Sequence, residues 1–362
     1  MGHGQEPTIL AYVGTYTREE SDGIYIYRFD PVTGALELLG SVEAENPSFL
    51  ATGPEQRFLY AVNEMGEFRG EPTGAVSAFS IDTETGMLTL LNQQPSQGVS
   101  PAHLSVDADG RFLYAANYTS GTVAVFPIQR DGSLGPATDT VVHEGSGPDL
   151  RRQKGPHAHS VTLDPSNRYA YVADLGIDKV MIYNITEEPG RLIPSDLPYA
   201  EVEPGSGPRH FAFHPSGRFA YLINEMGNTV TVFSFDGETG ALDELQTVPT
   251  LPEGYSGQNT TADIHVLQTG NFVYGSNRGH DSIVVYRADP DDGTLSLVAH
   301  TPTEGETPRN FAIDPTGTFL LVANQDSDTV VVFRIDPSTG RLSLTGQEVS
   351  VSMPVCVKLI VQ

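Results

Sequence analysis

Cysteine is nearly absent from this sequence, and its scarcity limits the chemistry that the chain can support. The 362 residues include one cysteine, Cys356. A single thiol cannot form an intramolecular disulfide or a cysteine metal cluster. The sequence also has no G-x-S-x-G elbow, no glycine-rich phosphate loop placed before a helix, and no cysteine nucleophile with a partner. These common catalytic devices are therefore excluded, and we expect neither a metal nor another cofactor.

Long apolar runs are missing as well. No segment approaches the ~20 consecutive apolar residues that a membrane-spanning helix requires. The first residues, MGHGQEPT, lack the basic and apolar regions of a signal peptide. We therefore expect a cytoplasmic protein without a membrane partner.

Basic residues, and lysines above all, are scarce. The chain has 46 acidic and 20 basic residues, for a net charge of −26, and its only lysines are Lys154, Lys179 and Lys358. Such a surface repels nucleic acid and anionic membranes at long range. We expect no nucleic-acid partner, and a monomer or weak homodimer. The acidity has two explanations: solubility, or adaptation to high salt, where the Debye length falls to ~3 Å at 1 M.

What the sequence has in quantity is turn residues and repeats. Its 37 Gly and 26 Pro fit a turn-rich β protein. The segment GPRHFAFHPSGRFAYLINEMGNTVTVFSF, residues 207–235, carries a plan of short strands and turns that five other segments share. The second strand of each unit ends at a corresponding residue, and the spacing of these endings is about fifty residues, which is the range of propellers. The endings are Gly14, Asn63, Asn117, Asp174, Asn224, Asn277 and Asn324.

This pattern predicts an all-β protein, one domain of residues 1–362 folded as a seven-bladed β-propeller with four-stranded antiparallel blades. The first unit begins at its second strand, Ile9–Tyr16, and residues 1–8 form a loose tail. The last residues, Met353–Gln362, have no partner strand of their own. They can supply the missing innermost strand as Val355–Val361 and close the ring, which removes exposed edges. The longer loops are expected at Glu64–Thr73, His143–Gly155, Ile185–Leu197 and Pro252–Thr261.

Polar side chains gather where first strands begin and second strands end. Two antiparallel strands joined by a tight turn bring these points to one sheet edge, so Arg209, His210 and Glu225 should lie together. Arginines are few in this acidic chain, and a group of them favours an anionic ligand. The candidate catalytic residues are His157, His159, Arg209, Glu225 and Arg278. The candidate substrate-binding residues are His210, Asp263, His265, His280, Arg309, Asn310 and Gln325.

Some of these residues have alternative roles. His157 and His159 lie two apart and share one face of a strand, a spacing that also suits a metal, but a general base or a hydrogen-bonding pair is the preferred interpretation. Arg209 and Arg309 could bridge blades through salt bridges to Glu225 or Asp263. Glu64 repeats the Asn-Glu-Met-Gly string of Glu225, so one of the two acids could be only a relic of the repeat.

The motifs YVGTYT, GPHAHS, GPRHFAFHPSGRFAYLINE, ADIHVLQTGNFVYGSNRG and TPRNFAIDPTG resemble the seven-bladed lactonase family. This family includes propeller-type 6-phosphogluconolactonases and the fungal carboxy-cis,cis-muconate cyclase. The resemblance covers nearly the whole chain and implies opening or formation of a lactone without a metal. The residue set proposed for the cyclase maps onto His157 or His159, Arg209, Glu225 and Arg278.

The resulting hypothesis is a lactonase acting on a sugar-acid lactone such as 6-phosphogluconolactone or a related aldonolactone. A histidine of the pair, or Glu225, takes a proton from the attacking water, and Arg209 and Arg278 stabilise the oxyanion or hold the substrate's anionic group. Two other functions remain open. One is a carboxymuconate-type cyclase, and the other is a non-catalytic scaffold similar to the YVTN-type propellers.

Overall fold

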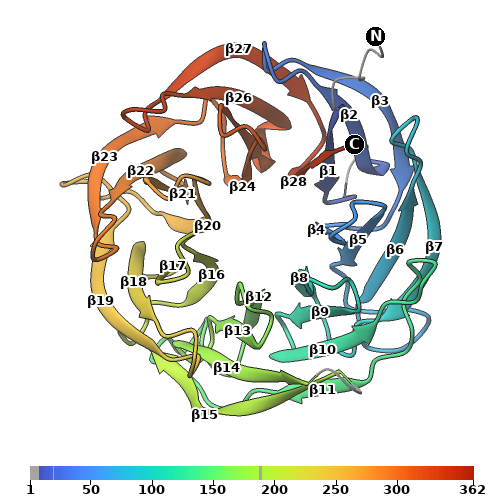
Figure 1. The fold of residues 1–362 in the computed structure, drawn as a ribbon, viewed down its shortest axis with the longest axis horizontal. Coiled ribbons are helices and arrows are strands. Elements are labelled where there is room, and N and C mark those ends of the chain that lie inside the picture. The colour runs from blue at the N-terminus through green and yellow to red at the C-terminus, as the bar shows by residue number, and fades with distance from the viewer. Residues whose placement is uncertain (1–7, 19, 187–189) are drawn as a thin grey trace.

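Seven four-stranded antiparallel sheets surround a central axis in the computed structural model of this protein, which describes residues 8–18, 20–186 and 190–362 (Figure 1). Six sheets use four consecutive strands, and the seventh has the order β28-β1-β2-β3. The predicted seven-bladed propeller is therefore confirmed. Within the described residues, the helical content is the single 3₁₀ turn η1 (Gln325–Ser327), and no helix is long and apolar enough to cross a membrane.

Each blade runs from an innermost strand at the axis to an outermost strand at the rim. The innermost strands are β4 (Phe49–Thr52), β8 (Pro101–Val106), β12 (Ala158–Leu163), β16 (Pro208–Phe213), β20 (Thr260–Val266), β24 (Pro308–Ile313) and β28 (Pro354–Val361). The second strands are β1 (Ile9–Thr15), β5 (Phe58–Asn63), β9 (Phe112–Asn117), β13 (Tyr169–Asp174), β17 (Phe219–Asn224), β21 (Phe272–Arg278) and β25 (Phe319–Asn324).

The third and fourth strands complete the blades. The third strands are β2 (Gly23–Phe29), β6 (Ala75–Ile81), β10 (Thr122–Pro127), β14 (Lys179–Thr186), β18 (Thr229–Phe235), β22 (Ser282–Ala288) and β26 (Thr329–Ile335). The outermost strands are β3 (Leu36–Glu43), β7 (Leu88–Pro95), β11 (Asp139–Val142), β15 (Arg191–Glu201), β19 (Leu242–Pro249), β23 (Leu295–Pro302) and β27 (Leu342–Ser350).

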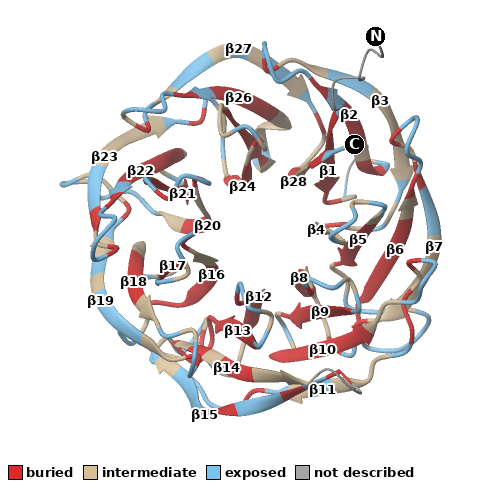
Figure 2. Cartoon of the chain, viewed as in Figure 1, coloured by how far each residue is buried: buried red, intermediate tan, exposed pale blue. Residues whose placement is uncertain are grey.

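The hydrophobic core lies between neighbouring blades. Seven clusters of buried side chains each draw on two adjacent sheets, so every blade packs on both of its faces. Figure 2 shows the result: the second and third strands are largely buried, and most of the exposed residues lie on the outermost strands and the loops. Each blade therefore contributes to two of these interfaces, and unfolding one blade would disrupt both.

The chain ends close the ring as the sequence predicts. Strand β28 pairs antiparallel with β1 from Ile9↔Val361 to Thr15↔Pro354, and Thr8 and Gln362 exchange backbone hydrogen bonds of 3.0 and 2.8 Å. Figure 1 shows β28 beside β1 at the axis. The expected loose tail is wrong for Thr8, because Gln362 holds its backbone, and the first seven residues of that tail lie outside the described residues.

One expected loop is wrong. The segment Ile185–Leu197 was predicted as a long loop, but β14 continues to Thr186 and β15 begins at Arg191. The two strands pair from Thr186↔Arg191 outward, with a bulge between Met181 and Tyr183. The prolines and charges of this segment hide the strand pattern because β15 is an edge strand, where one face and one row of backbone groups contact water.

A tyrosine in the second strand links each of several blades to the next one. Tyr221 donates a hydrogen bond of 3.1 Å to the carbonyl oxygen of Gly293, and both residues are buried. Gly293 has φ +74°, and a Cβ there would lie 2.4 Å from the ring of Phe219, so the turn requires glycine. The same contact recurs between Tyr12 and Gly86, Tyr60 and Gly132, Tyr171 and Gly240, and Tyr274 and Gly340.

Replacing Tyr221 with Phe is expected to lower the free energy of unfolding by about 1–3 kcal/mol, because the buried carbonyl of Gly293 loses its donor. Urea unfolding at neutral pH measures this effect. The matched control is Tyr199→Phe on the rim, where the ring is 42% exposed and a change within about 0.5 kcal/mol is expected. Equal effects of the two substitutions would show that the hydrogen bond from Tyr221 to Gly293 does not stabilise the contact between these blades.

Candidate functional site

β-Bulges near the beginning of three innermost strands set the direction of the arginine and histidine side chains. In β16, Pro208 pairs with Asn224 and His210 pairs with Ile223, so Arg209 is the extra residue of a β-bulge. The same shift makes His159 the extra residue in β12 and Arg309 in β24. A bulge bends the strand and redirects a side chain. The charged and imidazole groups therefore leave the packed sheet and reach the face of the propeller.

Glu225 is the centre of the polar cluster on this face. It follows the last residue of β17, and its Oε2 lies 3.0 Å from Nε of Arg209 and 2.9 Å from a terminal nitrogen of Arg278. Its Oε1 lies 2.6 Å from a terminal nitrogen of Arg152. The expectation that Arg209 and Glu225 lie together is confirmed. The side chains of Arg209 and Glu225 are 2% and 7% exposed, whereas Arg278 and Arg152 are more accessible at 14% and 41%.

The electrostatics of the cluster keep these groups ionised. Burial alone would raise the pKa of Glu225, but the guanidinium groups of Arg278, Arg209 and Arg152 outweigh it, and the pKa lies well below its ordinary range. Burial, helped by the positive charges of Arg278 and Arg309, lowers the pKa of Arg209 to about 9. Arg209 therefore stays protonated at neutral pH. A carboxylate held by three cations is a weak base, so Glu225 is better suited to positioning than to proton transfer.

A second carboxylate stands on the same face. Oε2 of Glu64 accepts a hydrogen bond of 2.9 Å from the hydroxyl of Tyr16 and lies 3.9 Å from a terminal nitrogen of Arg309. The guanidinium of Arg309 also stands over the Tyr16 ring, 5.4 Å from its centroid. Glu64 is thus part of the cluster and not only a relic of the repeat. Four guanidinium groups against two carboxylates leave a local excess of positive charge in a chain of net charge −26.

The two histidines have different surroundings. His157 is half-buried, its ring stacks on Tyr118 at 4.5 Å between centroids, and its Nδ1 lies 2.9 Å from the backbone carbonyl oxygen of Tyr118. A carbonyl only accepts, so Nδ1 carries the proton and Nε2 keeps a lone pair. The backbone nitrogen of His157 donates to Asp174 (2.7 Å), which holds the segment in place.

His159 is buried deeper in the cluster. Its side chain is 4% exposed, and its Nδ1 has no hydrogen-bond partner within the described residues. Burial and the charge of Arg209 lower its pKa well below the ordinary value. His159 is therefore neutral at pH 7, and its ring contacts Tyr118 and His210 edge-on at 5.5 and 5.2 Å between centroids. The pair at metal-like spacing is not joined by a third ligating side chain in the part of the chain that the structure describes.

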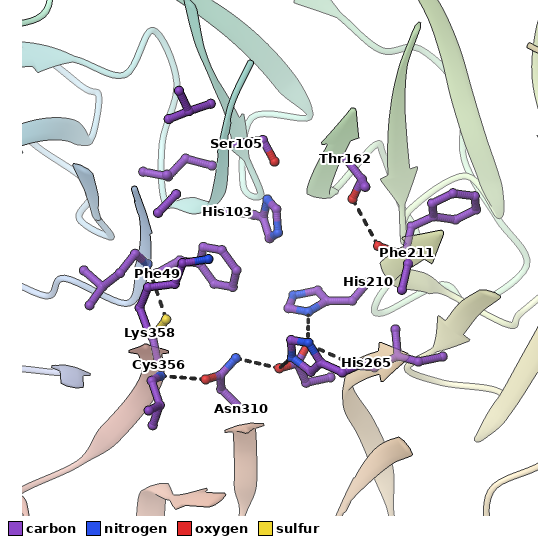
Figure 3. A pocket seen from close by; sticks show the side chains of 18 of the residues that line it. Phe49, His103, Ser105, Thr162, His210, Phe211, His265, Asn310, Cys356 and Lys358 are labelled. Carbon is purple, nitrogen blue, oxygen red and sulfur yellow. Dashed lines mark hydrogen bonds and ion pairs between the residues drawn. The ribbon is translucent and has the colours of Figure 1, made fainter. Parts of the chain in front are cut away.

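A chain of hydrogen bonds leads from the face into the central channel. A terminal nitrogen of Arg209 lies 3.2 Å from Nε2 of His210, and Nδ1 of His210 lies 2.7 Å from Oδ1 of Asp263. Burial, with the charge of Arg209, lowers the pKa of His210 to about 4. The ring is therefore neutral, accepting from Arg209 and donating to Asp263. Figure 3 shows His210 in this network, together with His265 and Asn310, which donate to the other oxygen of Asp263.

The buried neutral histidines predict a pH-dependent stability. Because the folded pKa of His210 lies below the unfolded value of 6.5, the unfolded chain binds more protons, and stability is lost as the pH falls from 6.5 toward about 4. The loss approaches about 1.4 kcal/mol per pH unit for each such group. His210→Gln is expected to reduce the slope of unfolding free energy between pH 6.5 and 5, measured by urea unfolding. An unchanged slope would show that His210 is protonated in the folded protein.

Not every predicted residue joins the cluster. The ring of His280 bonds to Ser282 (2.7 Å) and contacts Tyr255 and His300, toward the rim of its blade. Gln325 opens η1, and its side chain donates to Asp326 (2.8 Å).

Sequence reasoning did not assign Arg152, Tyr118 or Tyr16 to the site. Arg152 comes from the long loop His143–Gly155, which is longer than the corresponding connections between the other blades, and only its length and basic residues marked it.

Two cavities flank the cluster. An open depression of about 660 Å³ lies beside Arg278 on the face and is lined by Asn228, Gly257, Gln258, Asn259, Thr260, Gly279 and Thr307 as well. A cavity of about 390 Å³ occupies the central channel and reaches from His103, His210 and Asp263 toward the far ends of the innermost strands (Figure 3). The first of the two has room for a small anionic molecule beside Arg278, the one arginine that lines it.

Known proteins resemble this chain over its whole length. A family model described as "Lactonase, 7-bladed beta-propeller" matches residues 10–359. The 6-phosphogluconolactonase of Bacillus subtilis (strain 168) is 40% identical over 98% of this chain and 99% of its own length. The solved structure of a Pseudomonas aeruginosa periplasmic gluconolactonase is 37% identical, with a TM-score of 0.91 over 98% of this chain and 99% of that one. A Bacteroides fragilis structure, 38% identical, reaches a TM-score of 0.93 over 99% and 100%.

Proposed function

Because this chain belongs to the seven-bladed β-propeller lactonases, we propose that it hydrolyses the lactone ring of 6-phosphogluconolactone at the Glu225 cluster. The proposal that the substrate is phosphorylated rests on one observation, the excess of guanidinium groups on this face of a strongly acidic protein. Arginine binds phosphate and carboxylate through two parallel hydrogen bonds, which makes it suited to such a substrate.

His157 is the proposed general base. Its Nδ1–H is held by the carbonyl of Tyr118, and the lone pair on Nε2 is free to take a proton from water. The water oxygen then bonds to the lactone carbonyl carbon and forms a tetrahedral oxyanion. When the ring C–O bond breaks, the leaving alkoxide takes the proton back from His157 and the open-chain acid is released. General acid–base help of this kind is worth ~10²–10⁴-fold.

Arg278 and Arg309 are the proposed contacts to substrate negative charge. Both are partly accessible, at 14% and 18% of the side chain, and the buried Nε of Arg278 has no partner within the described residues. One of them stabilises the oxyanion, which is worth ~10²–10³-fold for a preorganised donor, and the other holds the phosphate. Arg209 and Glu225 lie beneath them and act as positioning residues. His159, Asp263, His265 and Asn310 support this layer from below.

The test is a pH-stat assay on 6-phosphogluconolactone, gluconolactone and carboxymuconate at equal concentrations. We expect the phosphorylated lactone to be preferred by ~10–100-fold in kcat/KM, the value of a charge-assisted contact. Arg309→Met should reduce this preference, and Arg341→Met, on the rim, should leave it unchanged. Turnover of carboxymuconate alone would identify a cyclase, and no turnover of any compound would identify a non-catalytic scaffold.

Two further parts of the proposal concern the environment of the protein. A phosphorylated lactone is charged and stays in the compartment where it is made, which favours the cytoplasm. The acidic surface is proposed as an adaptation to high salt. Running the same assay and urea unfolding in dilute buffer and in molar KCl tests the second point. Lower activity and stability in molar KCl would contradict it.

A further inference from the structure

The central channel contains a lysine, Lys358, that forms no ion pair with an acidic side chain in the described part of the chain. Lys358 lies on β28, and its side chain extends into the channel cavity (Figure 3). Its Nζ forms no hydrogen bond or ion pair within the described residues. By contrast, Lys179 on the rim pairs with Glu201 at 3.3 Å and stands 3.8 Å from the Tyr199 ring centroid. A channel ammonium group without a counter-charge is unusual in a protein of net charge −26.

The carboxylate in the same cavity does not supply that counter-charge. Oδ1 of Asp263 accepts from His210 (2.7 Å) and from the backbone of Ile264 (3.0 Å). Its Oδ2 accepts from His265 (2.9 Å), Asn310 (2.5 Å) and the backbone of Phe311 (3.3 Å). Five donors already satisfy this carboxylate, and the side chain is 4% exposed. The carboxylate of Asp263 therefore accepts hydrogen bonds from neighbouring groups in the channel wall and does not pair with Lys358.

His103 presents a second donor to the cavity. Its Nδ1 accepts the backbone N–H of Val161 at 3.4 Å, which places the ring proton on Nε2. The ring is 9% exposed and packs against Phe49 at 4.1 Å between centroids. The cavity is thus lined by an ammonium group and an imidazole N–H, and its one carboxylate is saturated. Lys358 is partly exposed to the cavity, and a positive charge in such an enclosure without a counter-charge favours a bound anion.

We propose that the channel is a second binding site, distinct from the Glu225 cluster, for a small oxyanion such as phosphate or a short carboxylate. Lys358 supplies the charge, and His103 donates a hydrogen bond. The site begins at the middle of the innermost strands and lies beyond His210 from Arg209, so it opens toward the face opposite Arg278. Its volume of about 390 Å³ suits a ligand of this size. Burial lowers the pKa of Lys358, and a bound anion opposes that effect.

Competitive acetylation tests the site because the chain has only three lysines. The protein is treated with a small amine-directed reagent, with and without inorganic phosphate at constant ionic strength, and each lysine peptide is quantified by mass spectrometry. Saturating phosphate is expected to slow the acetylation of Lys358 by about tenfold or more, as expected when the amine donates charge-assisted bonds. Lys154 and Lys179 should be unaffected. Equal rates for Lys358 with and without phosphate would overturn the proposal.

Substitutions distinguish phosphate binding in the channel from phosphate binding at the Glu225 cluster. Lys358→Met should weaken phosphate binding in the channel by ~10–100-fold, seen as a loss of phosphate-induced thermal stabilisation, whereas Lys358→Arg and Lys179→Met should keep it. Arg309→Met should leave the protection of Lys358 unchanged. If Arg309→Met abolishes that protection, phosphate acts from the Glu225 face and the channel site is refuted. The labelling of the unaltered protein decides the question even if Lys358→Met does not fold, and its result does not depend on lactonase activity.

Discussion

Deletion of residues 353–362 is expected to give an insoluble or an open, oligomerising protein. The deletion removes β28, whose backbone pairs with β1 over seven residue pairs from Ile9 to Thr15. It also removes apolar side chains from both faces of the strand, since Val357 belongs to the core cluster on one side and Cys356 and Ile360 to the cluster on the other. Each fully buried side chain of this kind contributes ~1.5–3 kcal/mol. The total rivals a typical stability of ~5–15 kcal/mol.

The edge left behind explains the expected oligomers. Without β28, β1 presents a full row of unpaired backbone groups at the axis, and an unpaired edge recruits another strand. Size-exclusion chromatography and expression in the soluble fraction measure the outcome. Trimming Met1–Glu6 should be nearly silent, because these residues show no strand pattern. A soluble, monomeric, fully active protein without its last ten residues would refute the closure of the ring by β28.

A pair of adjacent residues offers a milder test of the same strand. Ile360 is 1% exposed and Val361 is 37% exposed, so the two side chains differ in burial at nearly the same place. Ile360→Asp should reproduce the loss of soluble protein, because an unpaired buried charge costs several kcal/mol. Val361→Asp should be tolerated. The alternation of apolar residues along this strand predicts burial of Val355, Val357, Leu359 and Val361. The first two are buried, Leu359 is partly buried, and Val361 is exposed because it ends the strand.

Glu225→Gln is expected to lower kcat/KM by ~10²–10³-fold. The three arginines lose their common counter-charge and are no longer held in place, and a preorganised donor to the transition state has about this value. The amide keeps the shape of the side chain but leaves Arg209 buried without its ion pair. Loss of one partner of a buried pair should also destabilise the fold by about 3–5 kcal/mol. Steady-state kinetics on 6-phosphogluconolactone and urea unfolding, performed on the same preparation, measure the two effects.

Glu64→Gln is the matched control, because Glu64 stands in the same Asn-Glu-Met-Gly string at the corresponding position of another blade, and its contact to Arg309 is long, at 3.9 Å. It should change kcat/KM by no more than about tenfold, as expected for a long ion pair whose side chains are still 18% and 21% exposed. The pH–rate profile distinguishes the possible roles of Glu225. If Glu225 positions the arginines, its variant keeps the acid limb of the profile. If that limb disappears, Glu225 is the base, and the assignment of His157 is wrong.

Local chemistry explains why so much of the fold could be predicted. Three features are properties of short segments: the period of about fifty residues, the Asn or Asp at the end of six of the seven second strands, and the unpartnered strand near the C-terminus. Antiparallel pairing of consecutive strands then leaves little freedom, so Arg209 and Glu225 meet at one sheet edge whatever the rest of the chain does. The same reasoning failed at Ile185–Leu197, where prolines and charged residues interrupt the apolar pattern of an edge strand.

The roles within the site depend on contacts between segments far apart in the chain, and only the tertiary structure decides them. Arg152 reaches Glu225 from a loop that breaks the repeat, and this third guanidinium turns a candidate base into an anchor. The bonds from Nδ1 of His157 and His210 set which nitrogen carries the proton, and no spacing in the sequence encodes that choice. Lys358 likewise reads as an ordinary strand residue. Ring closure places it in the channel, where burial and the prior commitment of Asp263 leave its charge without a partner.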